Sequence, residues 1–535
     1  MNVDSQIADS QISVRDAVEG DVEQIRRIFQ AAYGDDYAFP QFFDAAYLKK
    51  QIFSDDCMML VAVDESSGEL LGTGSVVFDV GAFTDLLGEF GRLVVHPDGR
   101  GRGIATELMN VRLARVAEHL HVGLADNRVE HVYSQKISLH HGFAPVGYLP
   151  IHNGEPVALF ARFFNDSLSL RRNHPHIAPP IHWLADAAMR NVGLTCDVIV
   201  DESAVAYPSD DDFEVEEMTA KGYARLLRFE RGRLRNRGIF GPVKLHFGSR
   251  ALRRHNTNYL LAKCRGQLVG AIGYSRDPNI DNAVRIFELI HLNERPVRYL
   301  LSQLEHRCRK WGVDYIETDV SADAPRLQKT LLELGFLPLA YVPAGVFHYV
   351  ERLDVVRMAR YFVPLSMDNV CLVESMQPIA RRVIENFRSQ WIEPMLAAPL
   401  PQTFLFQGLN TEQTACLANL FQQVKIDANQ PITHQGARDG KAYVLIAGTA
   451  RIVVDKGATD VVSSGEFVGE FSLLNNAPHG ADVRTLESCE LAMIKNEDLT
   501  HLIQARGDIG CILYRNLAIG LGEKLKRSAI PEKLE

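Results

Sequence analysis

The residues with the clearest chemical potential form a short stretch rich in glycine and arginine. Arg100-Gly101-Arg102-Gly103-Ile104-Ala105 follows a strand-like run at 90–95 and leads directly into a helical pattern. Glycines let peptide N–H groups approach a ligand closely, and the N-terminal end of a helix adds a positive dipole. Arg100 and Arg102 would add charged hydrogen bonds to phosphate. The order strand, Pro turn, Arg-x-x-Gly-x-Ala and helix therefore predicts a pyrophosphate site, and the alternative is a plain strand-to-helix turn.

Length and composition set the class of protein that carries this stretch. The chain has 535 residues, 46% of them hydrophobic and 23% charged, with a formal net charge of -10. Its apolar runs, of which 58–63 is typical, are far shorter than the roughly 18 residues of a membrane span. The first residues, MNVDSQIADSQ, lack the basic and apolar pattern of a signal peptide. The eight cysteines include no C-x-x-C pair, which favours a reduced, cytoplasmic protein without a metal site. The short apolar runs argue against a membrane partner. The acidic balance disfavours nucleic-acid binding.

The elements around the stretch alternate between strand and helix. Period-2 and period-3.6 apolar patterns predict strands at 12–15, 58–63 and 70–78 and helices at 21–32 and 104–120. Interleaving of this kind predicts an α+β or α/β fold, with helices on the faces of a mixed sheet.

The middle of the chain repeats the same outline. Runs at 267–274, 283–292 and 295–311 match the hairpin arm, the strand before the glycine-rich stretch and the helix after it. In place of the glycines, the second copy has LNERPVRYLL. We interpret it as a degenerate duplicate that has lost the phosphate site and that shapes a cleft over the first copy.

Composition also marks the domain boundaries. An acidic stretch at 201–217 and a Pro-rich segment at 394–402 separate regions of different pattern. The last region is mostly β, with regularly spaced glycines typical of a jelly roll. The expected domains are 1–200, 201–365, a helical linker at 366–400 and 401–535.

With these motifs in place, the first segment resembles the GNAT acyltransferase superfamily from about residue 12 to 164. The resemblance includes Gly142-Phe143 and HVYSQKI at 131–137, which is similar to a subtype with an H-x-x-S-Q signature and a degenerate second half. It implies acetyl-CoA as co-substrate and acetyl transfer to an amine, either a protein lysine or a small molecule. The residues that it assigns to acetyl-CoA are Leu93, Val94, Val95, Arg100, Gly101, Arg102, Gly103, Ile104 and Ala105.

Acyl transfer to an amine needs a group that takes a proton. Glu89, eleven residues before Arg100, holds the place of the general base in histone-type members. Strand alternation would put it on the same face as Gly91, Leu93 and Val95. The alternative is a solvated carboxylate at the end of a strand.

The general acid is less well defined. The position at which many members carry a tyrosine is Ser138 here. Tyr133, His131 and His140 are nearby substitutes, and the thiolate can also leave through water.

The C-terminal region resembles cyclic-nucleotide-binding domains. FVGEFSLLNNAPHGADVRTLE, at 467–487, is similar to their phosphate-binding cassette. The resemblance implies a pocket built from Gly469, Glu470, Phe471, Ser472, His479 and Asp482. His479 replaces the arginine and Asp482 the Ser/Thr that contact the phosphate, so a module that kept the fold but lost this ligand is favoured over one that binds a cyclic nucleotide.

The sequence thus predicts a cytoplasmic acyl-CoA-dependent N-acyltransferase with a regulatory module. The rival interpretation is a non-catalytic sensor of CoA or nucleotide, or an interaction protein. The C-terminal helix, at 509–527, is a candidate for oligomerisation.

Overall fold

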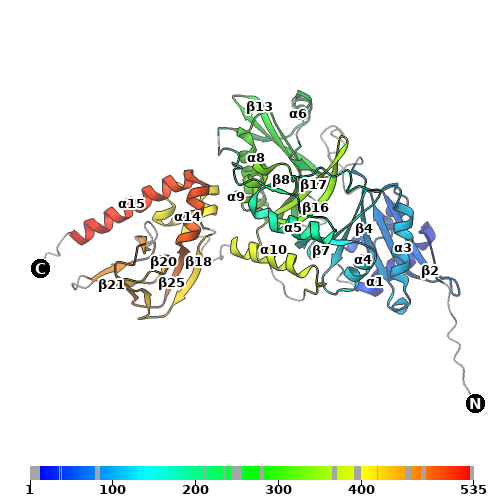
Figure 1. Cartoon of the computed structure of the whole chain (residues 1–535), viewed down its shortest axis with the longest axis horizontal. Coiled ribbons are helices and arrows are strands. Elements are labelled where there is room, and N and C mark those ends of the chain that lie inside the picture. Colours follow the sequence, from blue (N-terminus) through cyan, green and yellow to red (C-terminus); the bar gives the residue numbers. More distant parts are fainter. Residues whose placement is uncertain are drawn as a thin grey trace, which may run out of the picture. The chain divides into compact units, whose positions relative to one another are not determined.

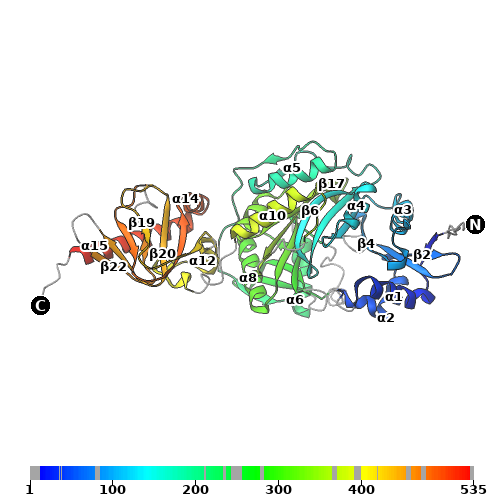
Figure 2. The ribbon, with the colours of Figure 1, turned by 90° about the horizontal axis from the view of Figure 1, so that it is seen from below.

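The computed structural model divides the chain into two compact units, Met1–Glu385 and Asn386–Glu535 (Figures 1 and 2). The described residues are 12–34, 37, 39–78, 85–209, 212–232, 237–241, 256–276, 282–363, 365, 370–390, 399–418, 420–453, 459–470 and 477–529.

The first half of the first unit is a mixed sheet with helices on both faces, as the alternating pattern predicts. Helices α1 and α2 cover one face, and α3 and α4 lie on the other (Figure 2). The strands, in spatial order, are β1 (Ile12–Asp16), β2 (Cys57–Asp64), β3 (Leu70–Val77), β4 (Leu87–Val95), β5 (Val122–Arg128), β7 (Glu155–Phe163) and β6 (Ala144–His152). The helices are α1 (Val22–Tyr33), α2 (Ala45–Ile52), α3 (Ile104–Val116) and α4 (Tyr133–His140).

The second half repeats the order of the first, which confirms the duplication. Among its described elements, α2 has no counterpart. A strand and a helix precede a three-strand meander, a crossover helix, a parallel strand, a second helix and a closing hairpin. These elements are β10 (Glu214–Glu217), α6 (Ala220–Gly232), β12 (Thr257–Cys264), β13 (Gln267–Ser275), β14 (Ala283–His291), α8 (Arg295–Trp311), β15 (Tyr315–Ser321), α9 (Pro325–Glu333), β16 (Leu337–His348) and β17 (Glu351–Tyr361). The short strand β11 (Ile239–Phe240) pairs with β15.

The two halves share one 15-stranded sheet through β6 and β16. The link is a single antiparallel pair, Gly147 with Ala340. A Cβ at Gly147 would lie 2.2 Å from that of Ala340, so only glycine allows the two halves to approach this closely.

The segments that follow each half pack on the same unit. They form β8 (His176–Ile177), α5 (His182–Asn191), β9 (Ile199–Val200) and α10 (Gln377–Gln390). Helix α10 buries Ile379, Val383 and Ile384, and the Arg382 guanidinium lies over the Trp183 ring of α5. The described residues of the expected helical linker up to Glu385 are therefore part of the first unit.

The second unit is a two-sheet β sandwich, as the glycine spacing predicts. One sheet runs β18 (Gln422–Ile426), β25 (Cys489–Lys495), β20 (Lys441–Ala447) and β23 (Phe467–Val468). The other runs β19 (Pro431–Thr433), β24 (Asp482–Thr485), β21 (Ala450–Val453) and β22 (Thr459–Val462). Helices α12 (Thr411–Ala418), α14 (Asn496–Ala505) and α15 (Gly507–Ala529) flank them. Short 3-10 turns are Glu19–Asp21, Pro40–Phe43, Pro97–Gly99, Pro179–Ile181, Leu400–Gln402 and Phe404–Phe406.

Candidate functional site

The bend between β4 and α3 exposes peptide groups to solvent. Gly101 and Gly103 adopt φ values of 81° and 75°, a left-handed conformation that glycine adopts without strain. A Cβ on either glycine would meet nothing within 4 Å. The first intrahelical bond runs from the Glu107 amide to the Gly103 carbonyl, at 3.0 Å. The amides of Ile104, Ala105 and Thr106 therefore have no acceptor within the helix and are free for an anion.

The two arginines of the bend differ in their surroundings. Arg102 pairs with Asp64 of β2, 2.9 Å between Nη2 and Oδ2. The Ser66 hydroxyl and Arg102 together lower the pKa of Asp64 to about 2. Arg100 is exposed and makes no ion pair within the described residues. Arg100 is thus the cation available to a ligand, whereas Arg102 first stabilises the bend.

Strands β4 and β5 separate beside this bend. Their parallel pairing covers only Leu87 to Glu89 on β4. Beyond it, β4 pairs with β3 up to Val95, and β5 pairs with β7 up to Arg128. Among the described strands, the edge of β4 from Phe90 onward has no partner on the β5 side, so its backbone groups can bind an extended ligand.

A β-bulge interrupts β4 at the same place. Thr73 faces Val94 and Ser75 faces Gly91, so two residues of β4 oppose Gly74 alone. The first of these two, Arg92, has a φ of 54°. An extra residue of this kind reverses the inward and outward alternation of the strand.

The bulge corrects the expected arrangement around Glu89. Glu89 does share a face with Gly91, because a Cβ on Gly91 would lie 3.1 Å from Glu89 Oε1. Leu93 and Val95, however, pack with Ile104 and Leu108 under α3. The prediction that all four share one face is wrong, because strict alternation does not continue through a bulge.

Glu89 is ion-paired on the face of α1 and α2. Its Oε1 lies 3.1 Å from Nη1 of Arg92, and its side chain is 28% exposed. Burial lowers the pKa of Arg92, but the negative charge of Glu89 raises it. The net shift of this pKa is upward. Arg92 also lies over the Phe42 ring. The carboxylate of Glu89 is therefore fixed by Arg92 but remains accessible to solvent.

Two candidates for the general acid, Ser138 and Tyr133, differ in their surroundings. Ser138 is buried, and its hydroxyl donates to Asn127 Oδ1 at 3.0 Å. Tyr133 is 69% exposed and contacts the His131 ring. The structure gives Ser138 a role in joining α4 to β5 and leaves Tyr133 largely exposed.

The glutamine of the H-x-x-S-Q motif holds the chain ahead of α10. Gln135 is fully buried. Its Nε2 donates to the Cys371 carbonyl at 2.8 Å, and its Oε1 accepts from the Val373 amide at 3.1 Å. The motif thus ties α4 to the segment that leads toward the second unit.

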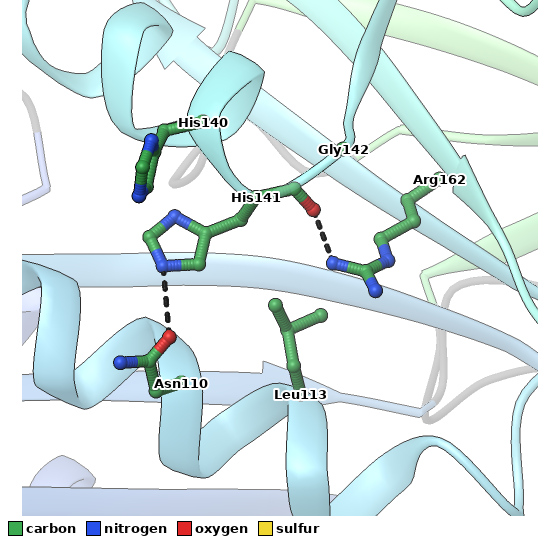
Figure 3. Close-up of a pocket in the computed structure, with 6 residues that line it drawn as sticks. All are labelled: Asn110, Leu113, His140, His141, Gly142 and Arg162. Carbon is green, nitrogen blue, oxygen red and sulfur yellow. Dashed lines mark hydrogen bonds between the residues drawn. The ribbon is translucent and has the colours of Figure 1, made fainter.

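A cavity of about 530 Å³ lies between the middle of α3 and the end of α4 (Figure 3). His141 Nε2 faces Asn110 Oδ1 at 3.1 Å, and Arg162 donates to the His141 carbonyl. Burial lowers the pKa of Arg162. Since α3 rises about 1.5 Å per residue, this cavity is separate from the bend at its first turn. Its lining is Asn110, Leu113, His140, His141, Gly142 and Arg162.

The second half has no equivalent of the bend. Helix α8 begins with Pro296 in its first turn and has Glu294 as its N-cap, which removes one donor and adds a negative charge where an anion would bind. In the second half, Arg285 of β14 faces Glu317 of β15. In the first half, Glu89 of β4 faces Leu124 of β5 at the same position of the parallel pairing. These replacements agree with a duplicate that has lost its phosphate site.

A polar cluster joins the two halves. His152 of β6 has Nε2 3.5 Å from Asp126 Oδ2 and Nδ1 3.9 Å from Glu317 Oε2. Burial lowers its pKa, but the two carboxylates outweigh burial and the net shift is upward. Arg285 pairs with the other oxygen of Glu317 at 2.6 Å.

Three predicted pocket residues of the second unit are engaged by other residues of the same unit. His479 Nε2 lies 2.8 Å from Asp439 Oδ1, and the histidine is 4% exposed. Asp482 Oδ1 accepts from the Gln435 amide at 2.9 Å. Lys524 of α15 pairs with Glu470. Gly469 has a φ of 96°, and Phe471 and Ser472 lie outside the described residues.

Within the described part of the chain, no helix is both long and apolar enough to cross a bilayer. The same residues contain no group of three or more histidines, cysteines or carboxylates placed to hold a metal ion.

Sequence reasoning missed the groups that support the predicted residues. Arg92, Asp64, Asp439 and Lys524 are ordinary charged residues in the sequence, and their partners lie far away along the chain or across a bulge. Arg112, by contrast, left a signal: it stands among apolar residues on the buried side of the predicted helix.

Family models match two parts of the chain. The acetyltransferase (GNAT) family matches residues 22–137, and the cyclic nucleotide-binding domain matches residues 423–506.

Relatives and solved structures match one part each. Potassium channel AKT1 of Oryza sativa subsp. indica is 25% identical over 131 residues, 24% of this chain and 14% of the channel. The cAMP-dependent protein kinase regulatory subunit of Mycosarcoma maydis is 25% identical over 126 residues, 22% of this chain and 24% of that protein. The chain therefore spans less than a quarter of the length of either.

Among solved structures, the ribosomal-protein-S5-alanine acetyltransferase of Vibrio fischeri is 20% identical, with 29% of this chain and 94% of that one covered and a TM-score of 0.26. The catabolite activator protein of Thermus thermophilus is 27% identical, with 24% and 60% covered and a TM-score of 0.21. The family models thus identify a GNAT acetyltransferase domain at residues 22–137 and a cyclic nucleotide-binding domain at residues 423–506.

Proposed function

We propose that the protein is an acyl-CoA-dependent N-acyltransferase that moves an acetyl group to an amine. The observation that carries the proposal is the open bend at Gly101 and Gly103, with unpaired helix amides behind it. A pyrophosphate at this bend would accept hydrogen bonds from residues 104–106 and charge-assisted bonds from Arg100. The unpaired edge of β4 would hold the pantetheine arm.

Glu89 is the proposed general base, directly or through water. It takes the proton of the acceptor amine while the nitrogen forms a bond to the thioester carbon. The tetrahedral intermediate then collapses, the C–S bond breaks, and the thiolate leaves with the electron pair. Because Ser138 is buried against Asn127, we propose that water protonates the thiolate.

The second unit is proposed to regulate this activity without a cyclic nucleotide as its ligand. The ion pair of Glu470 with Lys524 and the hydrogen bond between His479 and Asp439 occupy the groups that would bind ribose and phosphate. A carboxylate at position 482 would also repel a phosphodiester. A module that docks on another ligand or partner fits these contacts better.

A non-catalytic CoA sensor is the second candidate. The buried hydrogen bond of Ser138 favours it, since this hydroxyl is not placed as a general acid. Regulation would then follow from CoA occupancy, with no acyl group transferred.

One experiment separates the two. Acetyl-CoA is titrated into the full chain by calorimetry, and release of CoA thiol is followed with lysine peptides and with polyamines as acceptors. Binding with acceptor-dependent thiol release supports the transferase. Binding without release supports the sensor, and absence of binding contradicts both.

A further inference from the structure

A fully buried arginine lies beneath the bulge of β4. Arg112 projects from α3 and is 0% exposed. Its Nη1 donates to the Ser75 and Gly91 carbonyls, each at 3.1 Å, and its Nη2 lies 3.4 Å from Met109 Sδ. Ser75 and Gly91 are the last paired residues before the bulge. The guanidinium therefore bridges β3 and β4 where the ladder is interrupted.

The surrounding residues are built to accept this side chain. A Cβ on Gly74 would lie 3.4 Å from Arg112 Cζ and Nε, so the missing side chain lets the guanidinium lie against the strand. The Phe90 ring covers it, with 5.6 Å from Cζ to the ring centroid. Such a fit fixes the guanidinium plane relative to Gly91.

The charge of Arg112 has no counter-ion. No carboxylate lies within ion-pair distance of it in the described part of the chain, and Nε has no hydrogen-bond partner. Burial lowers the pKa of Arg112 to about 9, which leaves the group charged at neutral pH. Burying an unpaired cation is costly for a fold, and a methionine of similar length would avoid this cost. Stability therefore does not explain an arginine here.

We propose that Arg112 is a positioning residue for acyl transfer, acting on the bulge of β4 through the Gly91 carbonyl and through its unneutralised charge. This inference rests on the proposed function. By holding the Gly91 carbonyl toward α3, Arg112 fixes the bulge whose backbone faces the gap between β4 and β5. Its positive charge then stabilises the negative charge that forms on the thioester oxygen when the amine attacks, and on sulfur when the C–S bond breaks.

This role supplies what the site otherwise lacks. The hydroxyl of Ser138, at the position where a tyrosine acid is expected, is engaged with Asn127 and is not free to protonate the departing thiolate. A fixed cation in a water-poor region favours developing negative charge without donating a proton. The thiolate can then leave as an anion and be protonated by water.

The test compares Arg112→Met, which removes the charge, with Arg112→Lys, which keeps it but cannot bridge two carbonyls in the same way. Arg115→Met is the control, because Arg115 lies on the same helix and pairs with Asp16 at the surface. The probe is acetyl-CoA labelled with ¹³C at the carbonyl, bound to the full chain. Its chemical shift reports how strongly the protein polarises the carbonyl, with no acceptor present.

We expect the carbonyl signal to move downfield on binding to wild type, Arg115→Met and Arg112→Lys, and to move much less in Arg112→Met. With an acceptor, kcat of Arg112→Met should fall about tenfold, the change that corresponds to about 1.36 kcal/mol of lost transition-state stabilisation, while the acetyl-CoA Kd stays within about threefold. Its melting temperature should equal or exceed that of wild type, because an unpaired buried charge has been removed.

A wild-type carbonyl signal in Arg112→Met, or a kcat no lower than that of Arg115→Met, would overturn the inference. If Arg112→Met does not fold, Arg112→Gln replaces it as the neutral variant, with the same expectations for the carbonyl signal and kcat. Acetyl-CoA that fails to bind wild type contradicts the proposed function, whereas a bound carbonyl that does not respond to Arg112 contradicts this inference alone.

Discussion

Glu89 and Arg92 form an ion pair within β4, with 3.1 Å between Oε1 and Nη1. The pair depends on the bulge, because the left-handed φ of Arg92 turns its side chain back toward Glu89. The carboxylate is thereby held on the face of the sheet that α1 and α2 cover, beside the gap between β4 and β5.

Glu89→Gln tests the base directly. An amide cannot take a proton from an amine, so kcat should fall by about 100-fold or more, and the acidic limb of the rate-against-pH profile should flatten. Acetyl-CoA affinity, measured by calorimetry, should not change. Glu118→Gln, an exposed change on the same unit, is the control. An unchanged profile in Glu89→Gln would remove the assignment.

Tyr133→Phe tests whether a tyrosine hydroxyl serves as general acid. Because Tyr133 is 69% exposed, its loss should cost far less than the about 100-fold that removal of a general acid causes. Ser138→Ala should instead lower stability by about 1 kcal/mol, through the lost hydrogen bond to Asn127. Disappearance of the basic limb of the pH profile in either variant would contradict this account.

His152 predicts a pH dependence of stability. Its pKa in the folded chain is raised by Glu317 and Asp126 against the effect of burial. The stabilisation is therefore fully present below the ordinary histidine pKa of about 6.5 and is lost as pH rises through the raised value. Unfolding in urea, followed by tryptophan fluorescence, should show His152→Gln losing most stability relative to wild type at about pH 6. A difference that grows toward high pH would be the wrong sign.

The second unit predicts no response to cyclic nucleotide. Because His479 is already hydrogen-bonded to Asp439 and Glu470 is already ion-paired with Lys524, cAMP at millimolar concentration should leave the melting temperature of wild type unchanged. His479→Arg combined with Asp482→Ser restores the usual phosphate contacts and should produce a measurable increase with cAMP. An increase for wild type would show that the existing pairs open for the ligand.

The sequence was sufficient to predict the helices and strands around the site and the glycine-rich bend, because both depend on local patterns of residues. The helix at 104–120 and the strand at 90–95 correspond to α3 and to the end of β4. The duplication was visible because whole elements recur in order. These features come from periodicity and turn residues, which a sequence records directly.

The arrangement around Glu89 could not be predicted, because it depends on contacts between distant residues. The bulge arises from the pairing of β3 with β4, and period-2 alternation carries no sign of one extra residue. Arg102 contacts Asp64 from another strand. The sequence suggested Ser138 as a weak general acid. In the fold its hydroxyl donates a hydrogen bond to Asn127, which lies eleven residues earlier on β5.

The most direct test of the account is the affinity of acetyl-CoA for Gly103→Glu. The change places a side chain on a residue with a φ of 75° and brings a carboxylate to the predicted pyrophosphate position. Gly193→Glu, at a φ of 81° and with open space around it, is the matched control. Calorimetry should show one acetyl-CoA bound per chain in wild type and in Gly193→Glu, and no detectable binding in Gly103→Glu. Equal affinity in all three would contradict the placement of a diphosphate at the bend between β4 and α3.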